Sequence, residues 1–422
     1  MSLEERLQSV RKHMALAQAA TVAPPRRSPI PHDWTGRLAG NVEFLGAAGS
    51  FSVTSSYESG HTHGQQRFSD LTTVTGNAFS VVCRDPELSY ANLQGAVFLD
   101  TETTGLGMGT GTYVFLVGAG YMEGDRFIVK QFFLDAPGDE RVLLEALGSF
   151  LSRFPVLITF NGKAFDWPLL ESRFRLHRRS VPFDDPPHVD LLHPARRLWK
   201  RRLDSCALSS LETQILGVRR TIEDVPGWEI PFRYFGYQRS GDGSQLEGVF
   251  YHNLVDILSL ASLALHIDRV VADPNCGLVE HATDFFCIGK VYEVSGDGDM
   301  AVYCYERALR LGVPDELRPD CFLRLGTLHK RQRRWDAAIQ AWESLLDEGG
   351  RAGLVARVEL AKFYEHVERD YVTAIDHVQH ALVLAELFDS PWPDANLRDL
   401  EHRLSRLFNR SIRARDWAGT YG

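Results

Sequence analysis

The sequence contains few cysteines, and none of them forms a closely spaced pair. The 422 residues include six, at positions 83, 206, 276, 287, 304 and 321. Disulfide scaffolds and zinc knuckles need cysteines close together in the chain, so the spacing argues against both. It is typical of reduced thiols in a cytosolic protein, and we expect a cytoplasmic location.

Long apolar runs and an excess of positive charge are also absent. No segment reaches the ~18 consecutive apolar residues of a membrane span. Residues 1–20 alternate like a charged amphipathic helix rather than a signal peptide, so we expect no membrane partner. With 46 Lys and Arg against 55 Asp and Glu, the net charge is −9. A protein that coats duplex nucleic acid is normally basic, so any nucleic-acid contact here must be local.

Residues 1–90 carry the least informative pattern. A stretch rich in proline and arginine at 23–31 cannot form regular structure. Short alternating runs at 42–45 and 51–54 follow, broken by glycine and serine. We interpret this region as a partly irregular, β-rich N-terminal appendage, whose role stays open.

Residues 91–273 alternate between strand and helix patterns. The wholly apolar run 95–99 predicts a buried central strand. The runs 113–117 and 127–133, separated by a Glu-Gly-Asp turn, predict two antiparallel strands beside it. A helix and then a further strand at 155–160 come next. Together these elements predict an α/β domain with a mixed sheet flanked by helices.

Residues 280–390 look wholly helical and repeat with a period of about 36 residues. Small residues recur at Gly289, Gly326 and Ala361, and large side chains recur beside them. Small residues let paired helices approach closely, and large ones fill the gaps between them. The region resembles tetratricopeptide (TPR) repeats, which implies an all-α domain that binds a protein partner. An ordinary helical bundle is the alternative, and residues 391–422 are expected to form a helical tail.

Two carboxylates directly follow the first apolar strand. Asp100 and Glu102 lie on one face of the strand while Thr101 points away, because strand side chains alternate. Two carboxylates at a strand end can bind a hard cation such as Mg²⁺ or Mn²⁺. Solvated acids at a strand-to-turn junction are the alternative interpretation.

Two more acids occur at chemically notable positions further along the chain. Asp166 follows the strand at 155–160 and stands at the start of a helix, where a simple helix N-cap is the alternative. Asp256 lies within an apolar helix expected over 246–271, where a lone carboxylate is costly unless it binds something. His252 precedes Asp256 by four residues and so lies on the same helix face.

The four acids in this order resemble the DEDD (DnaQ-like, ribonuclease-H-fold) 3′–5′ exonucleases over residues 95–272. Asp166 stands in the string Asn-Gly-x-x-Phe-Asp-x-Pro-x-Leu that carries this resemblance. More closely, the chain resembles the YprB-type exonuclease-like family, on further strings at 112–118, 188–199, 211–213 and 224–231.

The resemblance implies a two-metal mechanism. Two Mg²⁺ or Mn²⁺ ions ~3.5–4 Å apart would activate water and stabilise the leaving 3′-oxygen. Their ligands would be Asp100, Glu102, Asp166 and Asp256. Such a cluster repels itself without metal, so we expect metal-dependent stability.

The identity of the general base stays open between two neighbouring residues. The histidine subclass of the family has its base five residues before the last Asp, which is Tyr251 here. The tyrosine subclass has it four residues before, which is His252 here, so the residue types are swapped against both spacings. We favour His252, because it lies beside Asp256 and an imidazole with a pKa near ~6.5 can orient or deprotonate water.

Substrate contacts are expected from Thr103, Asn161, Phe165, Arg196 and Arg197. Phe165 could stack on a terminal base. Basic runs at 173–179 and 196–202 could contact phosphates, although solvated helix faces are an equal alternative.

The sequence therefore predicts a metal-dependent 3′–5′ exonuclease acting on single-stranded DNA or RNA ends. Motif spacing does not encode recognition of the 2′-hydroxyl, so the choice between DNA and RNA stays open. The competing hypothesis is a non-catalytic adaptor, in which a degenerate nuclease fold binds nucleic acid and the repeats bind a protein. A zinc hydrolase built on His61 and His63 is a third.

Overall fold

The computed structural model describes most of the chain, in two compact units. The described residues are 34, 37–38, 40–46, 49–90, 92–105, 111–183, 186–221, 223–387 and 397–420, with side chains up to 413 in the last range. The amphipathic pattern expected at 1–20 lies outside them. The first unit comprises 1–195 and 205–268, and the second comprises 196–204 and 269–422. Among the described helices, none combines the length and apolar character that crossing a bilayer requires.

The first unit is built on a seven-stranded mixed sheet with the order β1-β2-β7-β6-β5-β8-β9. Its central strands β5, β6 and β7 form the expected antiparallel meander, and β8 and β9 run parallel to β5. The strands are β1 (Asn41–Phe44), β2 (Phe51–Tyr57), β5 (Ala96–Thr103), β6 (Val114–Glu123), β7 (Arg126–Phe133), β8 (Val156–Thr159) and β9 (His188–Asp190). A separate hairpin pairs β3 (Thr62–His63) with β4 (Gln66–Arg67).

The N-terminal region differs from its interpretation as an appendage. Strand β2 pairs with β7 along its full length, and β1 pairs with β2, so both belong to the main sheet. The alternating run at 51–54 buries Phe51 and Val53 in the core beside Trp34. Strand β1 is the edge strand and β2 lies next to it, and both are less buried than the central strands β5 and β6, so their apolar pattern is weaker.

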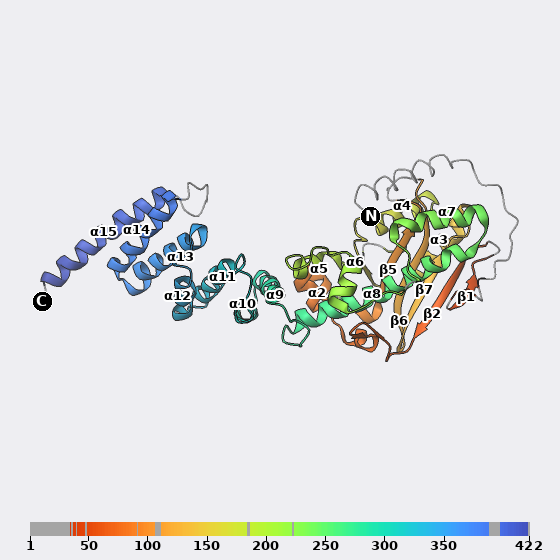
Figure 1. The fold of residues 1–422 in the computed structure, drawn as a ribbon, viewed down its shortest axis with the longest axis horizontal. Coiled ribbons are helices and arrows are strands. Elements are labelled where there is room, and N and C mark those ends of the chain that lie inside the picture. The colour runs from red at the N-terminus through yellow and green to blue at the C-terminus, as the bar shows by residue number, and fades with distance from the viewer. Residues whose placement is uncertain are drawn as a thin grey trace. The chain divides into compact units, whose positions relative to one another are not determined.

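Helices cover both faces of the sheet. Helix α8 (Glu247–Ala272) crosses β6, and a Cβ at Gly120 would lie 2.4 Å from Ile257 of that helix (Figure 1). On the other face, the ring of Tyr121 lies 5.3 Å from that of Phe150 in α3 (Glu140–Leu151). The remaining helices of this part of the chain are α2 (Asn77–Cys83), α4 (Asp166–Leu176), α5 (Leu192–Trp199), α6 (Leu208–Leu211) and α7 (Ile230–Ser240). The predicted mixed sheet flanked by helices is confirmed.

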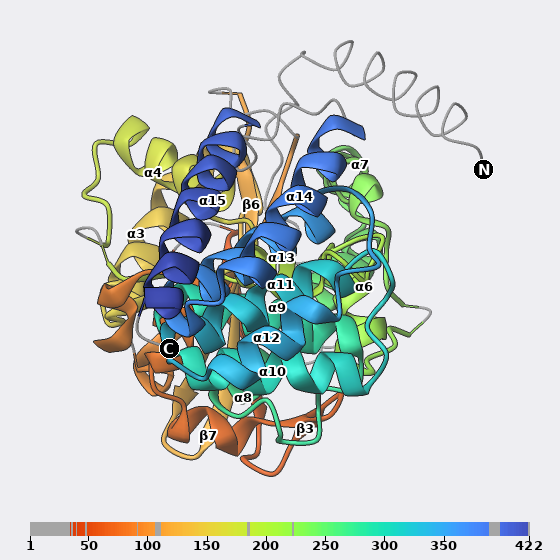
Figure 2. The ribbon, with the colours of Figure 1, turned by 90° about the vertical axis from the view of Figure 1, so that its left-hand side faces the viewer.

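The second unit is helical. Figure 2 faces it and shows its helices, each lying against the next. They are α9 (Ala282–Ser295), α10 (Gly298–Arg310), α11 (Arg318–Arg331), α12 (Trp335–Glu343), α13 (Gly350–Phe363), α14 (Tyr371–Leu387) and α15 (Leu397–Thr420). A Cβ at Gly289 would lie 2.8 Å from Tyr305, and one at Gly326 would lie 2.2 Å from Trp342. The recurring small residues therefore allow a large side chain of the paired helix to approach closely.

Candidate metal-binding and active site

Side chains at the end of β5 point alternately to the two faces of the sheet, as the strand geometry predicts. Asp100 pairs across the sheet with Gly118 and accepts a 2.9 Å hydrogen bond from Asn253 of α8. The hydroxyl of Thr101 instead donates to the carboxylate of Asp166. Asp100 and Glu102 therefore face α8, and Thr101 faces away from it.

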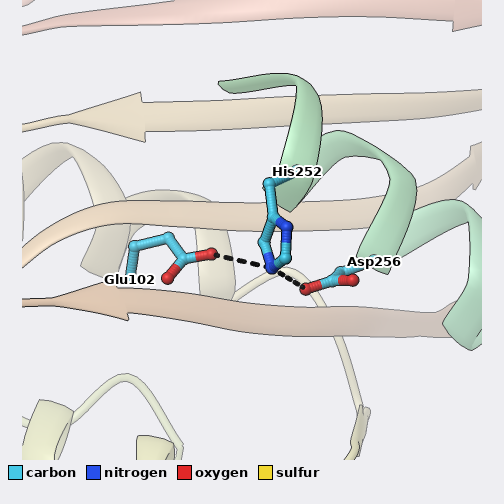
Figure 3. A group of neighbouring side chains, drawn as sticks. All are labelled: Glu102, His252 and Asp256. Carbon is cyan, nitrogen blue, oxygen red and sulfur yellow. Dashed lines mark ion pairs between the residues drawn. The ribbon is translucent and has the colours of Figure 1, made fainter. Parts of the chain in front are cut away.

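Glu102, His252 and Asp256 form the one group of three or more metal-ligating side chains within the described ranges. Their ligand atoms all lie within 4.8 Å of one another. The Nε2 atom of His252 is 4.0 Å from Glu102 Oε1 and 3.4 Å from Asp256 Oδ2, between the two carboxylates (Figure 3). His252 and Asp256 project from the same face of α8, which the four-residue spacing predicts.

The carboxylates of this site are costly to hold without a cation. Burial, and then the charges of Asp256 and Glu102, raise the pKa of Asp100 well above its ordinary value. Burial and the charges of Asp256 and Asp166 raise the pKa of Glu102 in the same way. Buried, mutually repelling carboxylate oxygens are hard anionic donors, so these residues fit the divalent metal that the resemblance implies.

Asp166 follows a loop whose backbone binds Asp190. Two backbone N–H groups of the loop, those of Asn161 and Lys163, donate to the buried carboxylate of Asp190 over 2.7 and 3.1 Å. Asp166 is the first residue of α4, and no side chain caps that helix. The N-cap interpretation of Asp166 is therefore wrong. Its carboxylate is not one of the group of three, although its charge raises the pKa of both Asp100 and Glu102.

Tyr251 and His252 are directed to different neighbours. The hydroxyl of Tyr251 accepts a 3.1 Å hydrogen bond from the backbone N–H of Thr221. His252 is the residue that faces the carboxylates, with Nε2 toward Glu102 and Asp256. The geometry thus favours His252 over Tyr251 as a base.

An arginine that the sequence analysis missed stands in the centre of the site. Arg220 donates to both oxygens of the buried Glu212, over 2.7 and 2.6 Å, and also donates to Asp256. Its Nη1 lies 3.1 Å from His252 Nδ1 and 3.4 Å from Asp224 Oδ1. Glu212 and Asp224 lie in two strings that carry the family resemblance, whereas Arg220 lies in none, so sequence spacing offered no signal for it.

Asn253 is a second missed residue, and it connects the sheet to Asp100. Its buried amide oxygen accepts a 2.9 Å hydrogen bond from Gln131 of β7. A Cβ at Gly118 would lie 2.4 Å from that same amide oxygen. A glycine at 118 is therefore what allows α8 to bring Asn253 down to Asp100.

His61 and His63, the residues of the zinc-hydrolase hypothesis, form contacts with other side chains. His63 hydrogen-bonds Ser259 of α8 over 2.9 Å, and burial lowers the pKa of His63 to about 4. Ser259 in turn donates to Glu212 over 2.6 Å, which links the β3–β4 hairpin to Arg220. The ring of His61 stacks on Phe68. In the described part of the chain, no third ligand joins His61 and His63 in a metal group.

The expected substrate contacts are spread over the chain. The side chain of Phe165 is exposed just before α4, and Asn161 has a left-handed backbone with φ of 65°. Thr103 donates to the carbonyl of Gly105 over 2.8 Å. Arg196 is exposed and Arg197 half-buried on α5, and both belong to the second unit.

Two residues of the basic runs form structural ion pairs instead. Arg173 is buried and donates through Nε to Glu140 over 2.5 Å. Arg202 binds both carboxylate oxygens of Asp284, over 2.8 and 2.9 Å. The interpretation of Arg173 and Arg202 as phosphate contacts is therefore wrong.

A cleft with a volume of about 770 Å³ lies beside α4. Its wall includes Trp167, Phe183 and Lys163, together with acidic side chains. That volume is large enough for a nucleotide-sized molecule, but the mixed charge of the wall favours neither phosphate nor cation.

Comparisons with known proteins agree with this geometry. Residues 97–267 match the RNase_H superfamily. The chain is 33% identical over 400 residues to "Uncharacterized protein YprB" of Bacillus subtilis (strain 168), an alignment that covers 90% of this chain and 94% of the relative. The matched superfamily range begins in β5 and ends in α8, and so contains Asp100, Glu102, Asp166 and Asp256.

Proposed function

Because this chain belongs to the family of the Bacillus subtilis protein YprB and carries an RNase H superfamily domain, we propose that it is a metal-dependent 3′–5′ exonuclease. The superfamily domain has a nuclease-like fold, which suggests that the protein processes nucleic acid. The proposal adds the direction of degradation and a single-stranded DNA or RNA end as the substrate.

One observation carries the proposal: buried carboxylates gather around His252 at the end of the central strand. A protein that only binds nucleic acid gains nothing from burying acids that repel both one another and phosphate. A phosphodiesterase gains a site for Mg²⁺ or Mn²⁺.

In this proposal Asp100, Glu102, Asp166 and Asp256 hold two divalent ions. When bound, such ions activate a water nucleophile and stabilise charge on the leaving oxygen. His252 accepts the proton of the attacking water through Nε2. Phe165 stacks on the terminal base, and Thr103 and Asn161 orient the strand.

The test is degradation of end-labelled single-stranded DNA and RNA with Mn²⁺, Mg²⁺ or EDTA. We expect a ladder that shortens from the 3′ end, requires metal, and is lost by at least about 100-fold in Asp100→Asn. Asp125→Asn makes the same chemical change at an exposed turn and should leave the rate unchanged. Intact oligonucleotide in every lane, from folded protein, would contradict the proposal and favour the non-catalytic adaptor.

For the second unit we propose a TPR-like module that binds a protein partner. The recurring close contacts at Gly289 and Gly326 support this, because they repeat the same packing in successive helix pairs. A photoreactive residue at the exposed Val294 of α9 should cross-link a defined partner, whereas one at Asp125 should not. Equal cross-linking from both positions would argue against a binding surface in this unit.

A further inference from the structure

Asp224 contacts the side of His252 that points away from the carboxylate group. It lies in the loop before α7, and its side chain is 24% exposed. Its Oδ1 atom is 2.7 Å from His252 Nδ1. The other ring nitrogen, Nε2, faces Glu102 and Asp256. The imidazole is therefore held between one carboxylate behind it and two in front.

The 2.7 Å distance decides where the ring proton lies. A carboxylate oxygen and a ring nitrogen can be this close only with a proton between them, and an ionised carboxylate can only accept. Nδ1 therefore donates to Asp224, and in the neutral ring Nε2 keeps its lone pair. A neutral imidazole has one donor and one acceptor nitrogen, so this contact selects the tautomer.

Arg220 favours the opposite arrangement. Its Nη1 lies 3.1 Å from the same Nδ1, and a guanidinium can only donate. If Nδ1 accepted from Arg220, the proton would move to Nε2, and that nitrogen could no longer take one. Asp224 prevents this because its contact with Nδ1 is the shorter one. Asp224 also offers Arg220 an acceptor at 3.4 Å.

We propose that Asp224 is the positioning residue of His252: it accepts the Nδ1 proton and thereby leaves Nε2 free to take a proton from the attacking water. The inference rests on the proposed nuclease function. In the step, one water proton goes to Nε2 and the water oxygen forms a new bond to phosphorus. The bond from phosphorus to the 3′-oxygen breaks, and that oxygen leaves with the electron pair and takes a proton from solvent.

The test compares Asp224→Ala with Glu223→Ala in the full chain. Glu223 is the exposed neighbour of Asp224 and carries the same charge, so it is the matched control. The first readout is the ¹⁵N spectrum of protein labelled only at histidine, with the His252 signals assigned by their loss in His252→Gln. The second is kcat and KM on end-labelled oligonucleotide. The third is Mn²⁺ binding by calorimetry.

We expect Asp224→Ala to move the His252 proton from Nδ1 to Nε2, since Arg220 then remains as the partner of Nδ1. The same variant should lower kcat about 10- to 100-fold while KM and Mn²⁺ affinity stay within about twofold. Adding Asp224→Ala to His252→Gln should cause no further loss of rate, because both act through one group. Asp224→Asn should recover part of the rate, and Glu223→Ala should change none of the readouts.

Three results would overturn the inference. An unchanged ring spectrum in Asp224→Ala would show that Asp224 does not hold the proton. A loss of Mn²⁺ binding would make Asp224 a metal ligand instead. An equal loss of rate in the His252→Gln background would mean that Asp224 acts independently of the ring. If the wild-type protein cleaves no oligonucleotide, the proposed function fails separately, and the spectrum still decides whether Asp224 sets the tautomer.

Discussion

Asp100 shows at the scale of a single residue what the site costs the fold. Among the described residues, Asn253 donates a hydrogen bond to its carboxylate, while Glu102, Asp166 and Asp256 surround it with like charge. Burial and these charges raise its pKa, so the folded protein binds a proton there that the unfolded chain has already released. The contribution of Asp100 to the free energy of unfolding is therefore fully present below the ordinary carboxyl pKa. It is lost as the pH rises toward the raised pKa.

We predict that Asp100→Asn stabilises the metal-free protein at neutral pH by about 1–2 kcal/mol. The gain should shrink as the pH falls toward 4, where the wild-type carboxyl is protonated in both states. Urea unfolding in EDTA at pH 5 and pH 8 measures this. Saturating Mn²⁺, at 100 times its Kd, should raise the wild-type free energy of unfolding by about 2.7 kcal/mol and leave the variant unchanged. A variant less stable than wild type in EDTA would mean that the ionised Asp100 carboxylate does not destabilise the metal-free fold.

At the scale of elements, one helix and one hairpin hold the site together. Helix α8 carries His252, Asn253 and Asp256, and the β3–β4 hairpin is bound to Ser259 and Ser262 further along the same helix. His63 bonds Ser259, and the hydroxyl of Ser262 donates to the carbonyl of His63 over 3.1 Å. Through Ser259 and Glu212, the hairpin supports the position of Arg220.

The hairpin predicts a specific sensitivity to acid. Burial holds the pKa of His63 at about 4, so the folded protein keeps His63 neutral while the unfolded chain takes up a proton below about 6.5. Its contribution is therefore present above about pH 6.5 and is lost as the pH falls toward 4, by at most about 3 kcal/mol. His63→Gln should lose less stability than wild type between pH 7.5 and pH 5 in urea unfolding. His188, whose pKa is also about 4, is present in both proteins and cancels in the comparison. Equal losses in the two proteins would show that His63 is not the titrating group.

The elements that could be predicted from sequence were those with one dominant signal. The apolar run before Asp100 marked β5, and the spacing from His252 to Asp256 placed both on one face of α8. Arg220 could not be predicted, because its contacts to Glu212 and Asp256, 8 and 36 residues away, follow no helix or strand period. Strands β1 and β2 were missed as parts of the main sheet because they join it through the pairing of β2 with β7, which lies about 75 residues later.

At the scale of the whole molecule, the two units are stabilised by separate buried groups. In the second unit the Glu365 side chain is fully buried and forms ion pairs with Arg403, Arg406 and Arg410 of α15. Although burial alone would raise its pKa, the hydrogen bond from Arg406 and the charge of Arg403 lower it. This carboxylate fastens the last helix to the rest of its unit, and it has no part in the carboxylate group of the first.

We therefore predict that Glu365→Gln weakens the second unit without affecting the site. Its loss should cost about 2–3 kcal/mol, because three arginines lose their buried acceptor charge. Hydrogen exchange should become faster in α15 and α14, while β5 and α8 keep their protection. Mn²⁺ affinity and the hydrolysis rate should match wild type. A change in either would show that the two units are energetically coupled.

Gly118 is required by the packing of the site although it takes no part in the chemistry. Any side chain there would meet the amide of Asn253 and push α8 off the sheet, although position 118 itself holds no metal, proton or substrate. A survey of tolerated substitutions would therefore score this glycine as strictly as Asp100, and would score Gln131 behind it nearly so. Intolerance to mutation at Gly118 measures how closely α8 must approach β6. A search for reactive groups among the intolerant positions would therefore find packing residues as well as catalytic ones.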